Sequence, residues 1–283
     1  MDDAARAIPA EMQGRHARIL DLVQRKGFVA IEQLAQDFGV SAQTIRRDIK
    51  ELARQQLLRR YHGGAGLPEQ ADRLAYGNRK IRHAAEKRRI AKLVAAQIPN
   101  GASLFIDIGT TMEAVAEALL QHEKLRVITN HMDVASLLSE RTDFEIIVAG
   151  GMLRNRDRAI TGEATSEFLR KFRVGYGIFG IGVIDEDGEM LDYDYRDVQV
   201  SITAMSIARR RFVALDHSKF SGDAMVRVCH VSEVEGVFTD APPPAKLARL
   251  LDQQGVTLFL PDGEADGSPA GDNRVSPLRN FDN

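Results

Sequence analysis

The sequence predicts two domains, a winged helix-turn-helix followed by an α/β domain with a Rossmann-like alternation of strands and helices. The first is indicated by an amphipathic helical pattern with a cationic face at residues 41–56, the second by short apolar runs that alternate with helical patterns after residue 101. Charge separates the two parts. Residues 1–95 hold 19 Lys and Arg against 11 Asp and Glu, a net charge of +8, whereas residues 96–283 hold 19 against 29, a net charge of −10. The N-terminal part is therefore suited to a polyanion.

Residues 41–56 predict the second helix of a helix-turn-helix. On a helical wheel Ile45, Ile49 and Leu52 share one side, and the opposite side is cationic. Ser41 is a suitable N-cap. A shorter amphipathic segment, residues 31–38, comes before it, and the glycine between the two segments allows a tight turn.

A short hairpin, the wing, is predicted where residues 57–64 follow this helix. We expect a first helix over residues 14–25 and an extended segment at 28–29 that pairs with the wing. A solvated charged face is the alternative, but the order of turn, basic helix and wing favours DNA. We expect base-edge contacts from Gln43, Thr44 and Arg47, and mainly phosphate contacts from the rest of a set that comprises Ser41, Gln43, Thr44, Arg46, Arg47, Lys50, Arg59, Arg60 and His62.

The division predicted from composition is a DNA-binding domain at 14–66, a linker at 67–78, an α/β domain at 79–260 and a disordered tail at 261–283. The α/β domain should begin with a long helix at 79–97, whose basic side could assist DNA contact. Alternating patterns then predict a largely parallel sheet. Its apolar strand-like runs are 103–108, 125–129, 144–149, 175–184, 212–215, 237–239 and 256–260, and the helical patterns are 111–120, 132–138, 164–172, 199–208 and 245–251.

Polar groups follow four of these runs, at 107–111, 129–130, 149–151 and 216–219. In open α/β sheets ligands bind at this edge, since helix N-termini present unpaired N–H groups there. Gly109, Thr110, Thr111 and Lys219 suit a phosphate, and nearby Asp107, Asn130 and Asp216 suit sugar or polyol hydroxyls. A capping box of Thr110 with Glu113 is the structural alternative for the first loop.

The basic run at 153–158 predicts a flexible loop in which Arg154, Arg156 or Arg158 could close over an anion, although a solvated loop or an interface suits the pattern equally. Asp216 and Lys219, with Glu189 nearby, could perform acid–base isomerisation. However, the sequence contains no nucleophile triad, metal-ligand cluster or phosphate-binding Gly-x4-Gly-Lys loop. We therefore expect a sensor without catalytic residues, metal or cofactor.

The single cysteine, Cys229, lies in an apolar strand-like run and is expected in the core. The N-terminus has no apolar signal-peptide stretch, and no run approaches the ~18 apolar residues of a membrane span. These features predict a cytoplasmic protein that does not enter the membrane.

The motifs VSAQTIRRD at 40–48 and RYHGGA at 60–65 resemble the winged head of the DeoR family of bacterial transcription regulators. DIGTT at 107–111, TN at 129–130, AGG at 149–151 and DHSKF at 216–220 are similar to the sensor domain of that family, whose fold is similar to sugar-phosphate isomerases such as ribose-5-phosphate isomerase. The resemblance implies a DNA-binding regulator that functions as a homo-oligomer, a dimer or tetramer. The effector contacts that it implies are Asp107, Gly109, Thr110, Thr111, Asn130, Gly151, Arg154 and Lys219.

Four further stretches, LFIDIGTT at 104–111, GEAT at 162–165, DYDY at 192–195 and TDAPPP at 239–244, look like the branch of the family that represses genes of glycerol metabolism and is released by glycerol 3-phosphate. Relatives that sense other sugar phosphates share the phosphate loops, so a different sugar phosphate is one alternative. An isomerase-like enzyme acting on a sugar phosphate is the other.

Overall fold

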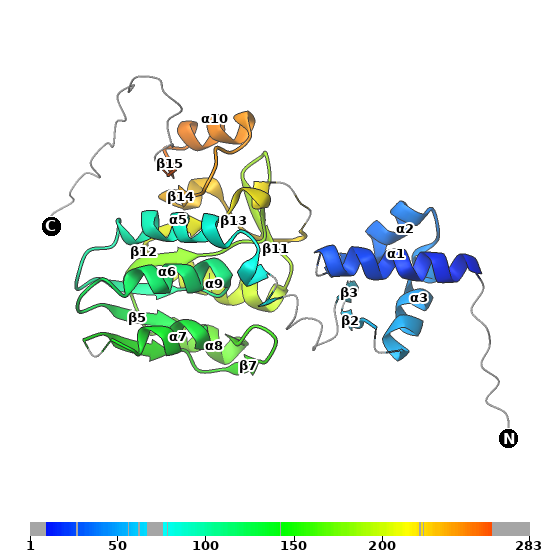
Figure 1. Cartoon of the computed structure of the whole chain (residues 1–283), viewed down its shortest axis with the longest axis horizontal. Helices are drawn as coiled ribbons and strands as arrows, with labels where there is room; N and C mark the ends of the chain where they lie inside the picture. The colour runs from blue at the N-terminus through cyan, green and yellow to red at the C-terminus, as the bar shows by residue number, and fades with distance from the viewer. Residues whose placement is uncertain are drawn as a thin grey trace.

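The computed structural model describes residues 10–26, 28–55, 57–61, 63–66, 76–77, 79–141, 143–220, 222 and 224–261 (Figure 1). The predicted tail, apart from residue 261, and most of the predicted linker lie outside these ranges. None of the described helices has the length and apolar character needed to cross a bilayer.

The N-terminal domain is a winged helix-turn-helix. Its small sheet has the order β1-β3-β2, with both pairings antiparallel, and its three helices enclose a core that includes Ile19, Leu34, Ile45 and Leu52. The expected pairing of residues 28–29 with the wing is therefore confirmed. The elements are α1 (Ala10–Lys26), β1 (Phe28–Ala30), α2 (Ile31–Phe38), α3 (Ala42–Arg54), β2 (Arg59–Tyr61) and β3 (Gly64–Gly66).

The turn before α3 forms as its sequence predicts. Gly39 ends α2 in the left-handed conformation that glycine adopts without strain (φ 61°), and the Ser41 hydroxyl accepts a hydrogen bond from the Thr44 N–H at 3.1 Å. The first helix differs from expectation, because it begins at Ala10 and not at residue 14. Its opening residues carry no apolar stripe, which is why periodicity alone missed them.

The C-terminal domain is built on a seven-stranded sheet of order β15-β14-β12-β9-β4-β5-β6, in which every pairing is parallel. The parallel sheet expected from the alternation is thus confirmed. Its strands are β4 (Ser103–Ile106), β5 (Arg126–Thr129), β6 (Glu145–Val148), β9 (Val174–Phe179), β12 (Ala208–Ala214), β14 (Gly236–Phe238) and β15 (Thr257–Phe259).

Helices cover both faces of this sheet, so the domain has three layers (Figure 1). One core, which includes Ile90, Val115 and Phe212, lies under α5 (Ala84–Ala95), α6 (Thr110–Leu119) and α7 (Met132–Leu138). The other includes Phe179, Val198 and Leu247. It lies under α8 (Glu163–Leu169), α9 (Tyr195–Ile207) and α10 (Ala245–Gln253).

Smaller elements complete the domain. A three-stranded antiparallel sheet has the order β10-β11-β13, and β7 pairs with β8 in a hairpin. Cys229 lies buried on β13, as expected. The bounds are β7 (Met152–Arg154), β8 (Ala159–Thr161), β10 (Val183–Ile184), β11 (Glu189–Asp192), β13 (Val226–His230), and the 3₁₀ turns η1 (His217–Phe220) and η2 (Val231–Glu233).

Three expectations about these segments were wrong. The run 175–184 is not one strand, because the chain leaves the sheet after β9 at the Gly-Ile-Gly segment 180–182 and enters the small sheet as β10. The helix expected at 79–97 is interrupted at His83, whose φ of 57° is left-handed, and α5 starts only after it. Residues 153–158 are not a flexible loop, since they belong to the β7–β8 hairpin and its turn.

Candidate functional site

The exposed face of α3 presents the side chains expected to read DNA. Gln43, Arg46, Arg47 and Lys50 are exposed, while Ile45, Ile49 and Leu52 are buried. Ser41 and Thr44 bind each other through their hydroxyls at 2.9 Å, which fixes the helix N-terminus. The helix therefore offers a rigid surface of amide and cationic donors, the chemistry that major-groove edges and phosphates accept.

A buried carboxylate anchors this helix to α1. Asp48, on the inner side of α3, accepts two hydrogen bonds from the Arg15 guanidinium, at 2.6 and 3.1 Å, and lies 3.2 Å from Nε2 of His16. Asp48 is 1% exposed, so the interaction is shielded from water. The sequence analysis did not single out this residue, because its partners lie more than 30 positions away.

The wing carries Arg59 and Arg60 on β2, both exposed. His62 lies outside the described residues. Two of the three wing residues expected at phosphates therefore lie on an exposed strand that pairs with β3, next to the helix-turn-helix core.

The four polar loops of the second domain lie at one edge of the sheet. They follow β4, β5, β6 and β12, and because these strands are parallel their carboxyl ends share that edge. A ligand site built from these four loops requires such a shared edge. The strand β9 lies between β4 and β12, so the loop at 216–219 is separated from the loop at 107–111 by one strand.

The loop after β4 has a helix N-terminus open to solvent. Gly109 is the N-cap, and α6 starts at Thr110 with no side-chain cap. The capping box of Thr110 with Glu113 is therefore not formed. The first N–H groups of a helix have no partner within it, and Thr110 and Thr111 are partly exposed, so the loop can donate to an anion.

Two buried side chains beside this loop have oxygens without partners among the described residues. Asp107 is 1% exposed; its Oδ2 accepts from the Ser201 hydroxyl at 2.8 Å, and its Oδ1 has no hydrogen bond. Asn130 donates through Nδ2 to the Ile160 carbonyl at 3.2 Å, and its Oδ1 also lacks a donor. Burial raises the pKa of Asp107 to about 7. Both oxygens can accept from ligand hydroxyls.

The loop after β12 places a lysine near two carboxylates. Burial lowers the pKa of Lys219, and the negative charges of Asp216 and Asp192 act against that shift. Burial would raise the pKa of Asp216, but hydrogen bonds from Ser218 and the charge of Lys219 outweigh it, so that pKa is lowered. Lys219 is thus a partly buried cation, and no hydrogen bond of its ammonium is found within the described ranges.

The loop after β6 is closely packed at Gly151. A Cβ at this position would lie 2.0 Å from Oγ1 of Thr165 and 3.0 Å from the Thr161 carbonyl oxygen. Its φ of 150° is also unfavourable for other residues. Thr165, at the start of α8, is fully buried, and its hydroxyl has no partner in the described structure.

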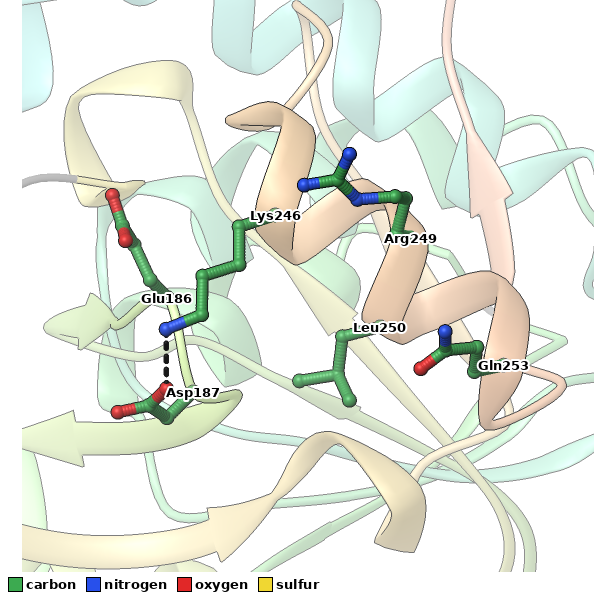
Figure 2. Close-up of a pocket in the computed structure, with 6 residues that line it drawn as sticks. All are labelled: Glu186, Asp187, Lys246, Arg249, Leu250 and Gln253. Atoms are coloured by element: carbon green, nitrogen blue, oxygen red, sulfur yellow. Dashed lines mark hydrogen bonds and ion pairs between the residues drawn. The ribbon is translucent and has the colours of Figure 1, made fainter.

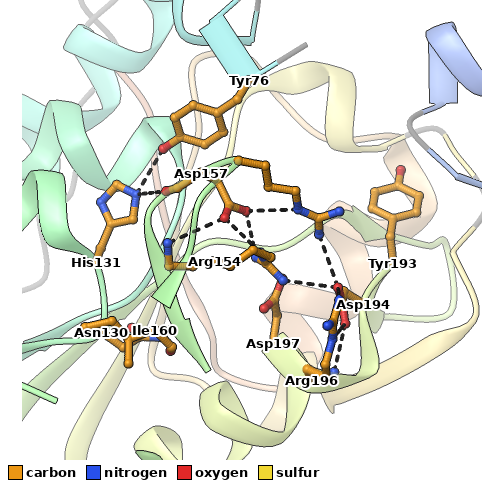
Figure 3. Close-up of polar contacts among 12 residues, drawn as sticks. Tyr76, Asn130, His131, Arg154, Asp157, Ile160, Tyr193, Asp194, Arg196 and Asp197 are labelled. Atoms are coloured by element: carbon orange, nitrogen blue, oxygen red, sulfur yellow. Dashed lines mark hydrogen bonds and ion pairs between the residues drawn. The ribbon is translucent and has the colours of Figure 1, made fainter. Parts of the chain in front are cut away.

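Arg154 lies in a cluster of carboxylates that includes Asp157, Asp194 and Asp197 (Figure 3). Its guanidinium donates to Asp157 at 2.6 and 2.8 Å, to Asp194 at 3.1 Å and to Asp197 at 2.8 Å. Burial alone would lower the pKa of Arg154, but these carboxylates raise it. Most of its donors are already used, so the expectation that it closes over an anion from a flexible loop does not fit the structure. Arg156 joins the cluster through Asp194, and Arg158 pairs with Asp133.

A hollow in the surface lies elsewhere, between α10 and the turn before β11 (Figure 2). It is lined by Glu186, Asp187, Lys246, Arg249, Leu250 and Gln253, and Lys246 pairs with Asp187 at 2.6 Å. None of the predicted site residues lines it. Glu189, expected near Asp216 in the enzymatic alternative, instead pairs with Arg227 at 2.5 Å.

Two sequence families match the chain. The DeoR-like helix-turn-helix domain matches residues 15–71, and the DeoR C terminal sensor domain matches residues 82–241. The chain belongs to the DeoR family. This DeoR-family regulator is 48% identical to the glycerol-3-phosphate regulon repressor of Escherichia coli (strain K12), over 87% of this chain and 98% of the relative. It is 47% identical to the glycerol-3-phosphate regulon repressor of Haemophilus influenzae, over 88% of this chain and 97% of the relative.

Among solved structures, ribose 5 phosphate isomerase A from Neisseria gonorrhoeae matches 48% of this chain with 53% of its own, at 16% identity and a TM-score of 0.33. Membership in this family contradicts the alternative that the chain is an isomerase-like enzyme, since the family's C-terminal domain is a sensor. Its helix-turn-helix domain binds DNA.

Sequence reasoning missed a second set of residues in the DeoR-family sensor domain. The Tyr76 hydroxyl donates to Glu113 at 2.5 Å and lies 3.1 Å from Nε2 of His131, and Lys80 pairs with Glu113 at 2.6 Å. The one signal in the sequence that could have indicated His131 is its position directly after Asn130, a predicted site residue. Its Nε2 also lies 2.9 Å from the Asp157 carbonyl, so the proton belongs on Nε2 (Figure 3). Tyr76, expected in the linker, therefore contacts the sensor domain.

Some of these side chains form groups with metal-ligand chemistry, namely Glu113 with His131 and Asp133, and His83 with Asp216 and His217. Each group is already engaged with cations or other partners. Lys80 pairs with Glu113, and Arg158 pairs with Asp133. In the second group, His217 binds Asp240 at 2.7 Å. Glu113, Asp133 and His217 thus already have partners, and we assign a metal ion to neither group.

Proposed function

We propose that this DeoR-family regulator represses genes of glycerol and glycerol 3-phosphate metabolism and leaves its operator when it binds glycerol 3-phosphate. The observation that supports this most is the identity, over nearly their whole length, to two regulators that carry the name of the glycerol-3-phosphate regulon. The proposal keeps the domain division made from the sequence, with DNA binding at 14–66, a linker at 67–78 and effector sensing at 79–260.

On the DNA side, Gln43, Thr44 and Arg47 contact base edges in the major groove. Phosphate contacts then set the position of the head, and they come from the N-terminus of α3 and from the cationic residues around it. Those residues are Ser41, Arg46, Lys50, Arg59, Arg60 and His62. The exposure of the α3 face supports this assignment for the described members of the set.

On the effector side, the phosphate is held by the first N–H groups of α6, at Thr110 and Thr111, and by Lys219. The glycerol hydroxyls donate to the unpartnered oxygens of Asp107 and Asn130. Gly109 and Gly151 let the ligand approach the backbone. Arg154 enters the proposal indirectly, because it neutralises the carboxylates that would otherwise repel a phosphorylated ligand.

We further propose that the regulator is a homo-oligomer, at least a dimer, and that its heads fit repeated half-sites. The effector then favours an arrangement of the heads that no longer matches the spacing. Linkage requires that DNA weaken effector binding by the same factor, with a coupling of about 1–3 kcal/mol. Sedimentation of the full chain with and without operator tests the stoichiometry. A monomer on a single half-site would contradict this part of the proposal.

The decisive test is operator binding by the full chain at several salt concentrations, with and without glycerol 3-phosphate. Affinity should fall steeply with salt, because phosphate contacts release counterions, and it should fall again on adding glycerol 3-phosphate. Lys219→Met should retain operator affinity and lose the response. Lys246→Met is the control. It alters an exposed lysine of α10 that belongs to none of the four loops, and this variant should respond as the unaltered chain does.

A thermal-shift panel of phosphorylated polyols and sugars identifies the effector, since a ligand that binds only the folded state raises its melting temperature. We expect the largest shift with glycerol 3-phosphate and none with glycerol. A larger shift with a hexose or pentose phosphate would assign the sensor to another sugar phosphate. It would contradict the glycerol assignment while leaving the DNA-binding assignment intact.

A further inference from the structure

One segment of the chain contacts the strand-end loop at 216–219 and two residues, Glu113 and His131, that lie just after the loops at 107–111 and 129–130. We call Tyr76 together with residues 79–87 the strap. Its Tyr76 and Lys80 bind Glu113, four residues after Gly109, and Tyr76 also contacts His131, the residue after Asn130. Farther along, the His83 ring packs edge-on against the His217 ring with centroids 4.9 Å apart. The strap thus lies along the proposed effector site, at the point where the chain enters the sensor domain.

The strap is held together from within. The ammonium of Lys87, a buried residue of α5, donates to the carbonyl oxygens of Arg79 and Arg82, the latter at 2.8 Å. The left-handed His83 turns the chain between this short helical turn and α5. Because these bonds tie both ends of the turn to α5, a change at Tyr76 and Lys80 is passed on along the backbone and is not absorbed locally.

The strap is bound by Glu113, a residue that lies close in the chain to the proposed phosphate site. Glu113 belongs to the first turn of α6, and its N–H bonds to the Gly109 carbonyl at 3.1 Å. A phosphate on the N–H groups of Thr110 and Thr111 would therefore lie within about one helical turn of the Glu113 carboxylate. Two anions this close repel each other, and the phosphate competes with Glu113 for Lys80.

Two other cations of the strap would also be attracted by a bound phosphate. Arg79 and Arg82 lie close enough to Lys219 for their positive charges to lower its pKa further, in addition to burial. Both side chains are exposed. An anion placed between α6 and Lys219 would relieve this repulsion. The strap therefore carries three cationic side chains, Arg79, Lys80 and Arg82, whose electrostatic surroundings become more negative when a phosphate binds at the N-terminus of α6.

We propose that the strap transmits effector occupancy to the DNA-binding head: phosphate at the N-terminus of α6 draws Lys80 from Glu113, unseats Tyr76 and so shifts the point from which the head is tethered. This inference rests on the proposed function, because it takes glycerol 3-phosphate as the ligand of the crevice. It assigns the coupling to the contact of Tyr76 and Lys80 with Glu113, three residues that the proposed function does not use.

The test compares the full chain with Tyr76→Phe and Lys80→Met. For each, the ratio of operator Kd with saturating glycerol 3-phosphate to operator Kd without it measures the coupling, and calorimetry without DNA measures glycerol 3-phosphate affinity. The ratio is typically about 5–150 in allosteric proteins, and in these variants we expect it to move toward 1 by about fivefold or more. Glycerol 3-phosphate affinity should change much less than the ratio for Tyr76→Phe, whereas Lys80→Met should also weaken it, because Lys80 moves toward the phosphate. Thermal melting confirms that each variant is folded.

Lys246→Met is again the matched control, since it removes an exposed lysine that pairs with Asp187 at 2.6 Å, and it should leave the ratio unchanged. If both strap variants retain the ratio of the unaltered chain, the strap does not carry the coupling and the inference is overturned while the proposed function stands. If the unaltered chain neither binds glycerol 3-phosphate nor responds to it, the proposed function fails, and the inference fails with it.

Discussion

Replacement of Asp107 by asparagine should make the stability of the sensor domain less dependent on pH. The carboxyl is 1% exposed, one oxygen accepts from Ser201 at 2.8 Å, and the other has no partner among the described residues. Burial raises its pKa from 3.8 to about 7. Between these two values the folded chain binds more protons than the unfolded chain, so the free energy of unfolding falls as pH rises.

The size of this effect follows from the shift. A rise in pKa from 3.8 to about 7, at about 1.4 kcal/mol per pH unit, corresponds to about 4 kcal/mol of unfolding free energy, which is lost between pH 4 and pH 8. The amide has almost the same shape and no charge, so Asp107→Asn removes this loss. The Nδ2 of the asparagine takes the place of Oδ1, which has no hydrogen-bond partner. Leaving this N–H group unpaired costs about 1–3 kcal/mol, and that cost does not vary with pH. The difference between variant and unaltered chain should therefore grow by about 4 kcal/mol from pH 4 to pH 8.

Urea unfolding followed by tyrosine fluorescence measures this difference, because Tyr76, Tyr176, Tyr193 and Tyr195 are four of the five tyrosines of the chain and it has no tryptophan. Asp216→Asn is the matched control, since Asp216 also follows a strand of the sheet but has a lowered pKa. Its carboxylate contributes stability above the unfolded pKa that is lost on acidification, so this variant should be less stable at pH 8 and approach the unaltered chain at low pH. Parallel pH profiles for Asp107→Asn and the unaltered chain would refute the reasoning.

Three further changes test other parts of the structure. Asp48→Ala removes the carboxylate that pairs with Arg15 and with the buried His16, and it should destabilise the head by about 2–4 kcal/mol in circular-dichroism melts. Glu51→Ala, at a partly exposed position of the same helix, should have no measurable effect, and equal melting curves for both variants would argue against the anchor. Arg47→Ala should weaken operator binding by about 1–3 kcal/mol and relax base preference at one position, as mobility-shift titrations can show; an unchanged affinity would remove it from the interface. Gly151→Ala should cost about 1–3 kcal/mol in urea unfolding, because its methyl group would meet Thr165, while Gly150→Ala, with open space around it, serves as control and should cost less.

The local features of the fold were predictable because their causes are local. Ser41 caps α3 through a residue three positions away, and the alternation of apolar runs with helical patterns is enough to indicate a parallel sheet. The carboxyl ends of parallel strands must share an edge, so gathering the four loops at that edge needed no knowledge of side-chain contacts.

The features that the sequence did not predict depend on distant partners. Asp48 meets Arg15 across 33 positions, and Tyr76 meets Glu113 across 37. Arg154 looked like a loop cation because two of its carboxylate partners, the N-cap Asp194 and Asp197 of α9, lie about 40 positions later. Charge pattern alone cannot tell a solvated arginine from one that is neutralised in the interior, since the same residue type serves both.

The strand order has a consequence for how the chain is synthesised. The strands β4, β5 and β6 emerge from the ribosome first, and β4 then has one paired edge and one open edge until β9 arrives, about 70 residues after β4 begins. The helix-turn-helix, whose contacts are local, is complete long before that. A chain that stalls before residue 174 would thus carry a finished DNA-binding head on a half-sheet whose apolar strand β4 is open on one edge, a species prone to aggregate and unable to sense its effector.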